Sequence, residues 1–315
     1  MNIVVTGGAG FIGSHLCARL LEEGHHVFCV DNLLTGSEQN IAALRHHPRF
    51  SFLQHDVTQP FEFEAEAIFH LASPASPVGY MEHPLETILV NSQGTHQLLE
   101  QARKQHARFL VSSTSEIYGD PLVHPQHEGY WGNVNPIGPR ACYDESKRLS
   151  ETLTMEYVRQ FGLNARIVRI FNTYGPHSQI NDGRMIPNFI TQALRNEPLT
   201  IYGDGSKTRS ICYVSDLVEG LLLAMFTPGT RGEVFNLGNP EEHTVLEFAH
   251  TIIKLCNASS DIIFEDSRVD DPERRRPDIS KAQQLLGWEL KVSMEEGLRR
   301  TIAWFSNQNT LSTIS

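Results

Sequence analysis

The chain has 315 residues, of which 40% are hydrophobic and 20% are charged, and this composition excludes disordered, collagen-like and disulfide-scaffold proteins. Its length suits one large α/β unit or two domains that share a cleft. The formal net charge of −11 argues against a phosphate-backbone partner, so we expect no nucleic acid to bind.

Signals for membranes, disulfides and metals are also missing from the sequence. No apolar run reaches the ~18 residues that span a bilayer, and residues 1–6 carry neither a basic region nor a cleavage site. We therefore expect a cytoplasmic protein with no membrane partner. The five cysteines form no C-x-x-C pair, and the 15 histidines lack H-E-x-x-H or H-x-E spacing, so we expect no metal site.

Short apolar runs alternate with segments of helical period in the first half of the chain. Strands are predicted at 3–5, 27–30, 50–53, 67–71, 109–111 and 165–170, and helices between them include 85–103 and 144–160. This alternation indicates an α/β fold with a Rossmann-type, doubly wound parallel sheet. We expect this domain to cover 1–171, with segments near 210–238 returning to it.

The pattern changes after residue 171. Glycine, proline and asparagine become frequent, and the helices predicted at 187–195, 215–225, 245–255 and 294–305 have no regular strand partners. We expect a smaller C-terminal lobe, mainly over 172–305, that covers the carboxyl edge of the sheet. Residues 306–315 are predicted to form a flexible polar tail.

A glycine cluster follows the first strand and opens a helix. Gly8, Gly10 and Gly13 fit G-x-G-x-x-G, and Gly7, Gly10 and Gly13 fit G-x-x-G-x-x-G equally well. Glycine permits a tight turn and lets backbone N–H groups approach a pyrophosphate at the helix N-terminus. Asp31 stands 18 residues after Gly13, where a ribose-binding acid is expected. Because its carboxylate would repel a 2′-phosphate, the cluster predicts NAD rather than NADP.

The remaining cofactor contacts are predicted around the ends of the following strands. Asp56 with Val57 could bracket the adenine, but an aspartate that caps a turn is an equally good interpretation. The full set predicted to contact NAD is Gly7, Gly10, Phe11, Ile12, Gly13, Asp31, Asn32, Thr35, Gly36, Asp56, Val57, Leu71, Ala72, Ser73, Tyr143 and Lys147.

Tyr143 and Lys147 stand four residues apart in a predicted helix, so their side chains share a face. An ammonium group near a phenol lowers the tyrosine pKa, as does a positively charged nicotinamide ring, and both make Tyr143 a candidate base near neutral pH. A Y-x-x-x-K pair also occurs on ordinary protein surfaces. The glycine motif about 130 residues upstream gives this pair its functional interpretation.

Together with residues 113–119, these motifs resemble the extended short-chain dehydrogenase/reductase family, whose members modify nucleotide sugars. The strings at 70–77, 130–140 and 275–279 resemble the UDP-glucuronate decarboxylases within it, and the similarity runs from Asn2 to about Phe305. The resemblance implies oxidation of C4 of the uronic acid by NAD, loss of C6 as CO2 and re-reduction to UDP-xylose. It also implies a homodimer that packs through the helices at 85–103 and 144–160.

Residue roles follow from the same resemblance. Tyr143 is the acid/base, Lys147 holds the nicotinamide ribose, and Thr114 donates a hydrogen bond to the 4-oxygen. Ser115 and Glu116 lie where related dehydratases carry an Asp-Glu pair. Because a uronic acid has no C6 hydroxyl to eliminate, Ser115 in place of that aspartate favours decarboxylation over dehydration.

Arg275 matches an arginine that the family places near the sugar carboxylate. Its neighbours Asp270, Asp271 and Glu273 also allow a solvated, charge-balanced loop. For the UDP-glucuronate substrate, the resemblance implies contacts from Asn172, Asn188, Tyr202, Arg209 and Arg275. The chain departs from the family at Leu89-Val90, where a Lys-Thr pair is usual.

Two other functions remain open from the residues alone. A nucleotide-sugar 4-epimerase or 4,6-dehydratase would share the cofactor site and the tyrosine. A non-catalytic NAD-binding sensor would keep the fold, although the presence of both Tyr143 and Lys147 argues against it.

Overall fold

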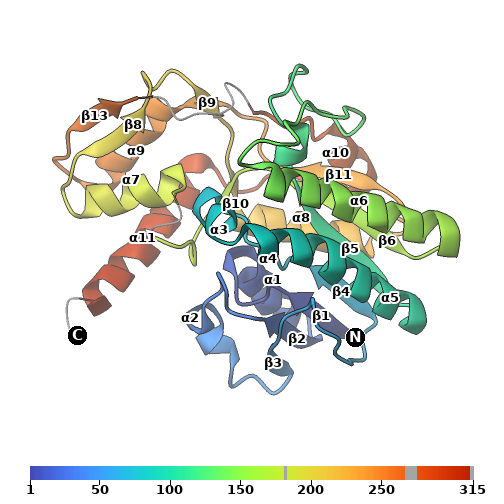
Figure 1. Cartoon of the computed structure of the whole chain (residues 1–315). Coiled ribbons are helices and arrows are strands. Elements are labelled where there is room, and N and C mark those ends of the chain that lie inside the picture. The colour runs from blue at the N-terminus through green and yellow to red at the C-terminus, as the bar shows by residue number, and fades with distance from the viewer. Residues whose placement is uncertain (181–182, 267–274, 313–315) are drawn as a thin grey trace.

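A seven-stranded parallel sheet forms the centre of the computed structural model, which describes residues 1–180, 183–266 and 275–312 (Figure 1). The strand order is β11-β6-β5-β4-β1-β2-β3, and every neighbouring pair is parallel. The strands are β1 (Asn2–Thr6), β2 (His26–Asp31), β3 (Phe50–Gln54), β4 (Ala67–His70), β5 (Arg108–Thr114), β6 (Ala165–Ile170) and β11 (Val234–Leu237). The predicted Rossmann-type fold is confirmed, and the order reverses between β1 and β4, where such sheets bind ligands.

The central strands are buried on both faces, which explains why their sequences are continuous apolar runs. Ile3, Val4 and Val5 of β1 are completely buried, as are Ile68 and Phe69 of β4. Helices cover both sides of the sheet, so neither face of a strand needs polar residues. The sheet therefore has little freedom to shift its register, and its carboxyl edge is a rigid platform.

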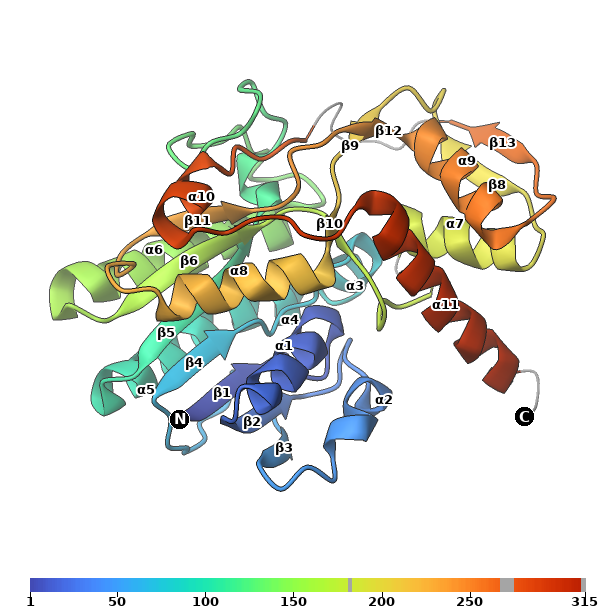
Figure 2. The same cartoon turned by 180° about the vertical axis from the view of Figure 1, so that it is seen from behind.

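The helices form one layer on each face of this sheet. Helix α1 (Phe11–Glu22) contacts α8 (Val214–Phe226) on one face, in front of the sheet in Figure 2. On the other face, α4 (Pro84–Leu89) and α5 (Thr95–Gln105) follow one another along one line, and α6 (Ala141–Phe161) packs beside both, in front in Figure 1. The helix predicted at 85–103 is interrupted by a π-helical turn, η2 (Val90–Gly94).

A smaller lobe lies beyond the carboxyl edge of the sheet. Helices α7 (Met185–Leu194), α9 (Val245–Cys256) and α11 (Met294–Ser312) contact one another there (Figures 1 and 2). Its strand pairs are β8 (Leu199–Tyr202) with β13 (Ile262–Glu265) and β9 (Thr208–Arg209) with β12 (His243–Thr244). The remaining elements are α2 (Glu38–Ile41), η1 (Ala42–Leu44), α3 (Pro77–Glu82), η3 (Ser115–Tyr118), β7 (Thr173–Tyr174), β10 (Cys212–Tyr213) and α10 (Ser280–Leu286).

The C-terminal segment differs from its prediction. Helix α11 continues to Ser312. The prediction of a flexible tail is therefore wrong for residues 306–312, and residues 313–315 lie outside the described part. Serine and asparagine are poor helix formers, so the polar composition of this segment favoured a tail, and local contacts in the folded chain support the extra turns. Ser306 Oγ also donates to Ile302 O, and Gln308 accepts a hydrogen bond from Gln39. No helix in the described ranges is long and apolar enough to cross a bilayer.

Asp216 on α8 connects the sheet layer to the chain that leads into α11. Its Oδ2 accepts hydrogen bonds of 3.0 Å from both Lys291 N and Val292 N, and its carbonyl accepts one of 2.8 Å from Trp288 Nε1. Asp216 is 3% exposed and Trp288 is completely buried. The carboxylate therefore supplies the acceptor for two partly buried backbone N–H groups.

We expect Asp216→Ala to lower the free energy of unfolding by about 2 kcal/mol, because the N–H groups of Lys291 and Val292 lose their acceptor. Urea unfolding followed by circular dichroism measures the change. Asp204, an exposed residue that caps a surface turn at Ser206, is the control; its alanine variant should cost less than about 1 kcal/mol. Equal losses in the two variants would contradict this interpretation.

Candidate active site

A cavity of about 500 Å³ opens where the carboxyl edge of the sheet meets the smaller lobe. Every residue assigned above to the cofactor, the catalytic group or the substrate lines it. They are Gly7, Gly10, Phe11, Ile12, Gly13, Asp31, Asn32, Thr35, Gly36, Asp56, Val57, Leu71, Ala72, Ser73, Thr114, Ser115, Glu116, Tyr143, Lys147, Asn172, Asn188, Tyr202, Arg209 and Arg275. The fold thus brings together residues that are up to 268 positions apart in the chain.

The glycine turn lies at the C-terminal end of β1, beside the start of α1. A Cβ atom on Gly13 would lie 2.1 Å from Gly7 O, and one on Gly7 would lie 2.7 Å from Ala72 N, so neither position has room for a side chain. Gly7 also has a φ of +71°. Gly10 is the N-cap of α1 and offers no side chain to the first-turn N–H groups, which makes this helix end suitable for an anion.

Asp31 ends β2 and is 7% exposed. Its carboxylate accepts hydrogen bonds from Ala9 N at 3.0 Å and Leu33 N at 2.8 Å, while burial raises its pKa. A Cβ on Gly36 would lie 2.8 Å from this carboxylate. The glycine therefore leaves open the side of Asp31 from which a hydroxyl group could approach.

Asp56 fits both of its predicted interpretations. It caps a turn, because Oδ1 accepts hydrogen bonds from Thr58 N at 2.9 Å and Thr58 Oγ1 at 2.8 Å. It also lines the cavity, where Oδ2 accepts a hydrogen bond from Asn32. Burial raises the pKa of Asp56, but the hydrogen bonds from Thr58 and Asn32 outweigh this effect and lower it.

Tyr143 and Lys147 lie on the first two turns of α6, both almost completely buried. Lys147 Nζ donates to Ser112 O at 2.8 Å and lies 5.9 Å from the centre of the Tyr143 ring. Tyr80 stacks on Tyr143 with ring centres 5.0 Å apart and planes within 6°. This packing restricts the orientation of the phenol ring, which lines the cavity.

In the protein without ligands, burial shifts the pKa of Tyr143 in the direction opposite to the one expected from Lys147 and a nicotinamide ring. Burial raises the pKa of Tyr143 to about 12, although a hydrogen bond with Thr114 opposes the shift. Burial also lowers the pKa of Lys147 to about 7, against the attraction of Glu151. Desolvation causes both shifts because it disfavours the charged form of each group, and the spacing of two residues does not reveal it.

Glu116 lies between two arginines. Arg275 forms a two-pronged ion pair with it, in which Nη2 lies 3.0 Å from Oε2, and Arg140 pairs with the same carboxylate. Arg275 is 7% exposed, so it is not part of a solvated loop. The acidic neighbours weighed against it, Asp270, Asp271 and Glu273, and the adjacent Arg274 lie outside the described residues.

Three cavity residues or neighbours were not assigned from the sequence. Arg140 and Tyr80 line the cavity, and Asp144 follows Tyr143 on α6. Burial, then repulsion from Glu116, raises the pKa of Asp144 to about 7, and its Oδ1 is buried without a hydrogen-bond partner. Arg140 has a local signal, because it precedes Tyr143 by one helical turn, but nothing near Tyr80 in the sequence marks it.

The residues predicted for the substrate lie across the cavity from the glycine turn. Asn172 follows β6, Asn188 is on α7, Tyr202 ends β8, and Arg209 is on β9, where it donates to Thr208 O at 2.8 Å. Tyr202 is 38% exposed, so its ring is available to a ligand. These four side chains come from elements of the lobe and its connection to the sheet.

We expect Gly13→Ala to lower the free energy of unfolding by about 1–3 kcal/mol, because its Cβ would meet backbone atoms that cannot rotate away. Gly10→Ala is the matched comparison in the same turn. Its Cβ would lie 3.1 Å from Gly7 O, so a small adjustment suffices and the loss should be under about 1 kcal/mol. Denaturant unfolding of both variants checks this order, and a Gly10→Ala loss equal to that of Gly13→Ala would refute it.

Known proteins match this chain over most of its length. Residues 3–238 match the model of the NAD dependent epimerase/dehydratase family. UDP-glucuronic acid decarboxylase 1 of Danio rerio is 53% identical over 98% of this chain and 73% of its own length. UDP-glucuronic acid decarboxylase 1 of Arabidopsis thaliana is 52% identical over 98% of this chain and 70% of its own length.

A solved structure has the same fold and a related ligand. The UDP-glucuronic acid 4-epimerase of Bacillus cereus, in complex with UDP-glucuronic acid and NAD, superposes with a TM-score of 0.87 at 30% identity. The match covers 98% of this chain and 100% of that one. The chain therefore belongs to the NAD dependent epimerase/dehydratase family, and UDP-glucuronic acid decarboxylases are among its curated relatives.

Proposed function

We propose that this chain is a UDP-glucuronate decarboxylase, which converts UDP-glucuronate to UDP-xylose and CO2 with a bound NAD. The observation that carries the proposal is the position of Arg275, which pairs with Glu116 in the same cavity as Tyr143 and Lys147. A cation suited to a sugar carboxylate thus lies beside a tyrosine suited to hydroxyl oxidation. The curated relatives of the same name, at about half identical residues, support this assignment.

The residues present fit NAD. Side chains at positions 7 and 13 would fill the turn that a pyrophosphate approaches, and the space beside Asp31 is kept open by Gly36. We assign cofactor binding to the set predicted from the sequence, with Asp31 on the adenosine ribose and Lys147 on the nicotinamide ribose. Bound there, NAD would supply the hydride acceptor for C4 of the sugar and the donor for its later reduction, and a positive ring that favours the phenolate form of Tyr143.

Tyr143 removes the proton of the 4-hydroxyl group as C4 is oxidised, and Thr114 donates a hydrogen bond to the 4-oxygen. The 4-keto uronic acid is a β-keto acid, so the C5–C6 bond breaks with loss of CO2 and its electron pair forms an enolate. Lys147 stabilises the phenolate because its ammonium lies beneath the ring. After C5 has gained a proton, Tyr143 returns its proton to the 4-oxygen.

We assign the carboxyl end of the sugar to Arg275, which is paired with Glu116. The guanidinium anchors the C6 carboxylate, since an arginine holds its proton too tightly to be an efficient acid near neutral pH. Ser115 stands where dehydratases carry an aspartate. An aspartate there would place another carboxylate beside Glu116 and would repel the C6 carboxylate of the substrate. Asn172, Asn188, Tyr202 and Arg209 are assigned to the UDP moiety, with Arg209 on the diphosphate.

A nucleotide-sugar 4-epimerase is the second candidate, because the Bacillus cereus neighbour of that name holds UDP-glucuronic acid in the same fold. Mass spectrometry of the product separates the candidates. Incubation with UDP-glucuronate should yield a product lighter by one CO2, whereas epimerisation leaves the mass unchanged and dehydration removes one water. A product of unchanged mass would overturn the decarboxylase assignment.

We expect Tyr143→Phe to lower kcat by about 10²- to 10⁴-fold, because the variant has no group to accept the 4-hydroxyl proton. NAD affinity, measured by calorimetry, should change far less, because the stacked ring is retained. The two measurements together separate a catalytic role from a structural one. Full turnover by this variant would instead support the non-catalytic sensor.

We also propose the division of labour between the two parts of the chain and its location. Residues 1–171, with segments near 210–238, bind NAD, and residues 172–305 mainly bind the nucleotide sugar. Support comes from the glycine turn on β1 and from the lobe positions of Asn188 and Tyr202. All five cysteines are free thiols, as in proteins of a reducing compartment, and we place the enzyme in the cytoplasm.

A homodimer is proposed because large apolar side chains are exposed on neighbouring helices. Leu85 and Leu89 on α4 are 68% and 46% exposed, and Leu149 on the adjacent α6 is 43% exposed. These two helices form the outer layer of one face (Figure 1). A second copy packed on this face would cover the apolar surface.

Leu149→Lys should convert the dimer into a monomer, because it places a charge in the proposed contact. Light scattering coupled to gel filtration measures the mass in solution. Leu285→Lys is the matched control, since Leu285 is 51% exposed on α10, away from this face. A wild-type chain that is monomeric at micromolar concentration would contradict the proposal.

A further inference from the structure

Glu151 is a buried carboxylate that the mechanism above does not use. It lies one helical turn after Lys147 and two turns after Tyr143, so all three side chains leave the same face of α6. Its side chain is 13% exposed. A carboxylate placed in this position without partners would be costly, so its contacts indicate why it is there.

Three hydrogen bonds fix the carboxylate of Glu151. Arg169 on β6 donates from Nε to Oε1 at 2.9 Å and from Nη2 to Oε2 at 2.8 Å, and Ser113 on β5 donates from Oγ to Oε1 at 2.5 Å. Ser113 is the residue after Ser112, whose carbonyl accepts from Lys147 Nζ. The end of β5 therefore binds the lysine and the glutamate through consecutive residues.

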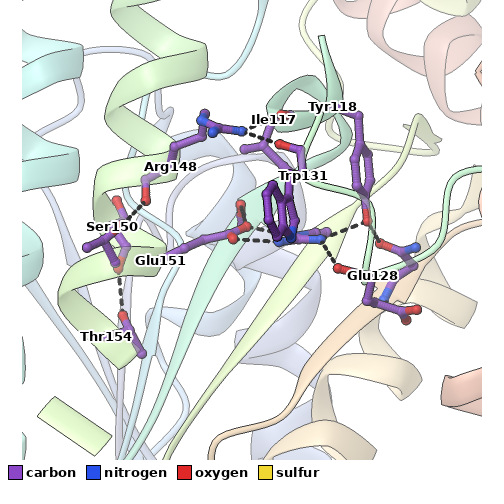
Figure 3. A network of polar contacts seen from close by, with 12 residues as sticks. Ile117, Tyr118, Glu128, Trp131, Arg148, Ser150, Glu151 and Thr154 are labelled. Carbon is purple, nitrogen blue, oxygen red and sulfur yellow. Dashed lines mark hydrogen bonds and ion pairs between the residues drawn. The ribbon is translucent and has the colours of Figure 1, made fainter. Parts of the chain in front are cut away.

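Arg169 is itself held from the other side. Its Nη1 donates to Tyr118 Oη at 2.9 Å and to Glu128 O at 3.0 Å, and Tyr118 Oη donates to Asn236 Oδ1 at 2.8 Å. Glu151 and Tyr118 point into this network from α6 and η3 (Figure 3). A guanidinium with partners on both sides cannot swing away, so Glu151 has one orientation.

Among the residues that the structure describes, Glu151 is the anion whose attraction acts on Lys147. His70 on β4 is fully buried between Thr6 and Thr95 and stays neutral, because burial lowers its pKa to about 3. Tyr143 on α6 holds its proton in the protein without ligands. Arg169 on β6 faces the far side of Glu151, so it weakens the negative field but does not cancel it at the lysine.

We propose that Glu151 is a positioning residue for Lys147: its carboxylate, held by Arg169 and Ser113 one helical turn away, keeps the buried ammonium charged while Ser112 O orients it. The proposal rests on the role assigned to Lys147 in the proposed function. Burial alone drives Lys147 toward its neutral form, and a neutral amine cannot favour the Tyr143 phenolate. The network therefore keeps the Tyr143–Lys147 pair active as the pH rises.

Two charge-changing variants test this with opposite expected signs. In Glu151→Gln the lysine loses its negative neighbour, so the alkaline limb of the turnover against pH profile should move down by about one unit. In Arg169→Gln the carboxylate is left uncompensated, so the same limb should move up. Loss of activity that is equal at every pH in both variants, or shifts of the same sign, would overturn the proposal.

A second measurement reads the lysine directly and does not depend on turnover. The chain has six lysines, so the ¹³Cε signal of Lys147 can be assigned by its loss in Lys147→Arg and titrated by NMR. Its midpoint should fall in Glu151→Gln and rise in Arg169→Gln. These shifts test the network even if UDP-glucuronate is not decarboxylated, so failure of the proposed function would be recognised separately. A midpoint that stays unchanged in both variants would overturn the proposal.

Two further variants guard the test against unfolding and against general effects. The double variant Glu151→Gln/Arg169→Gln leaves no unpaired charge. The titration midpoint of its Lys147 should lie between the midpoints of wild type and Glu151→Gln. A midpoint at or above that of wild type would count against the proposal. Glu156→Gln is the control, because Glu156 lies on the same helix, is exposed and pairs with Arg159. Glu156→Gln should leave the NMR midpoint of Lys147 and the pH profile as they are in wild type. A shift as large as that in Glu151→Gln would overturn the proposal.

Discussion

The ammonium of Lys147 is buried against the carbonyl of Ser112, and much of the site depends on this contact. It fixes the start of α6 on the end of β5, and so it fixes Tyr143 one turn earlier. A charged group in this position is unstable without a compensating anion. The anion is the carboxylate of Glu151, which Arg169 and Ser113 hold in place and which offsets the cost of burying the ammonium. Arg169 also connects this part of α6 to β6.

The fold was largely predictable because its central strands are buried on both faces. Continuous apolar runs such as 67–71 then identify strands without any knowledge of their neighbours. Strands β8 and β13 were not predicted because they are short and half-exposed, with patterns set by one small contact in the lobe. The π-helical turn at Val90–Gly94 and the length of α11 also depend on tertiary packing and not on composition.

The site was predictable where its chemistry is encoded locally. The glycine turn, Asp31 and the Tyr143–Lys147 pair each carry a spacing with a physical reason. Arg275 had no such signal, and only family resemblance separated it from a solvated loop; its burial against Glu116 requires the folded chain. The rise of the Tyr143 pKa in the protein without ligands had no local signal either, since the desolvation that causes it arises from residues such as Tyr80 that are distant in sequence.

The two-pronged pairing of Arg275 with Glu116 has a consequence for the catalytic cycle. In the proposed role of Arg275 as anchor of the C6 carboxylate, an incoming uronate competes with Glu116 for this arginine, which weakens ground-state binding of the substrate. Once CO2 has left, the pentose has no anion to offer at this position, and Glu116 can take its place again. The internal competitor thus discriminates against the product, and a decarboxylase built in this way expels the sugar that it has just made.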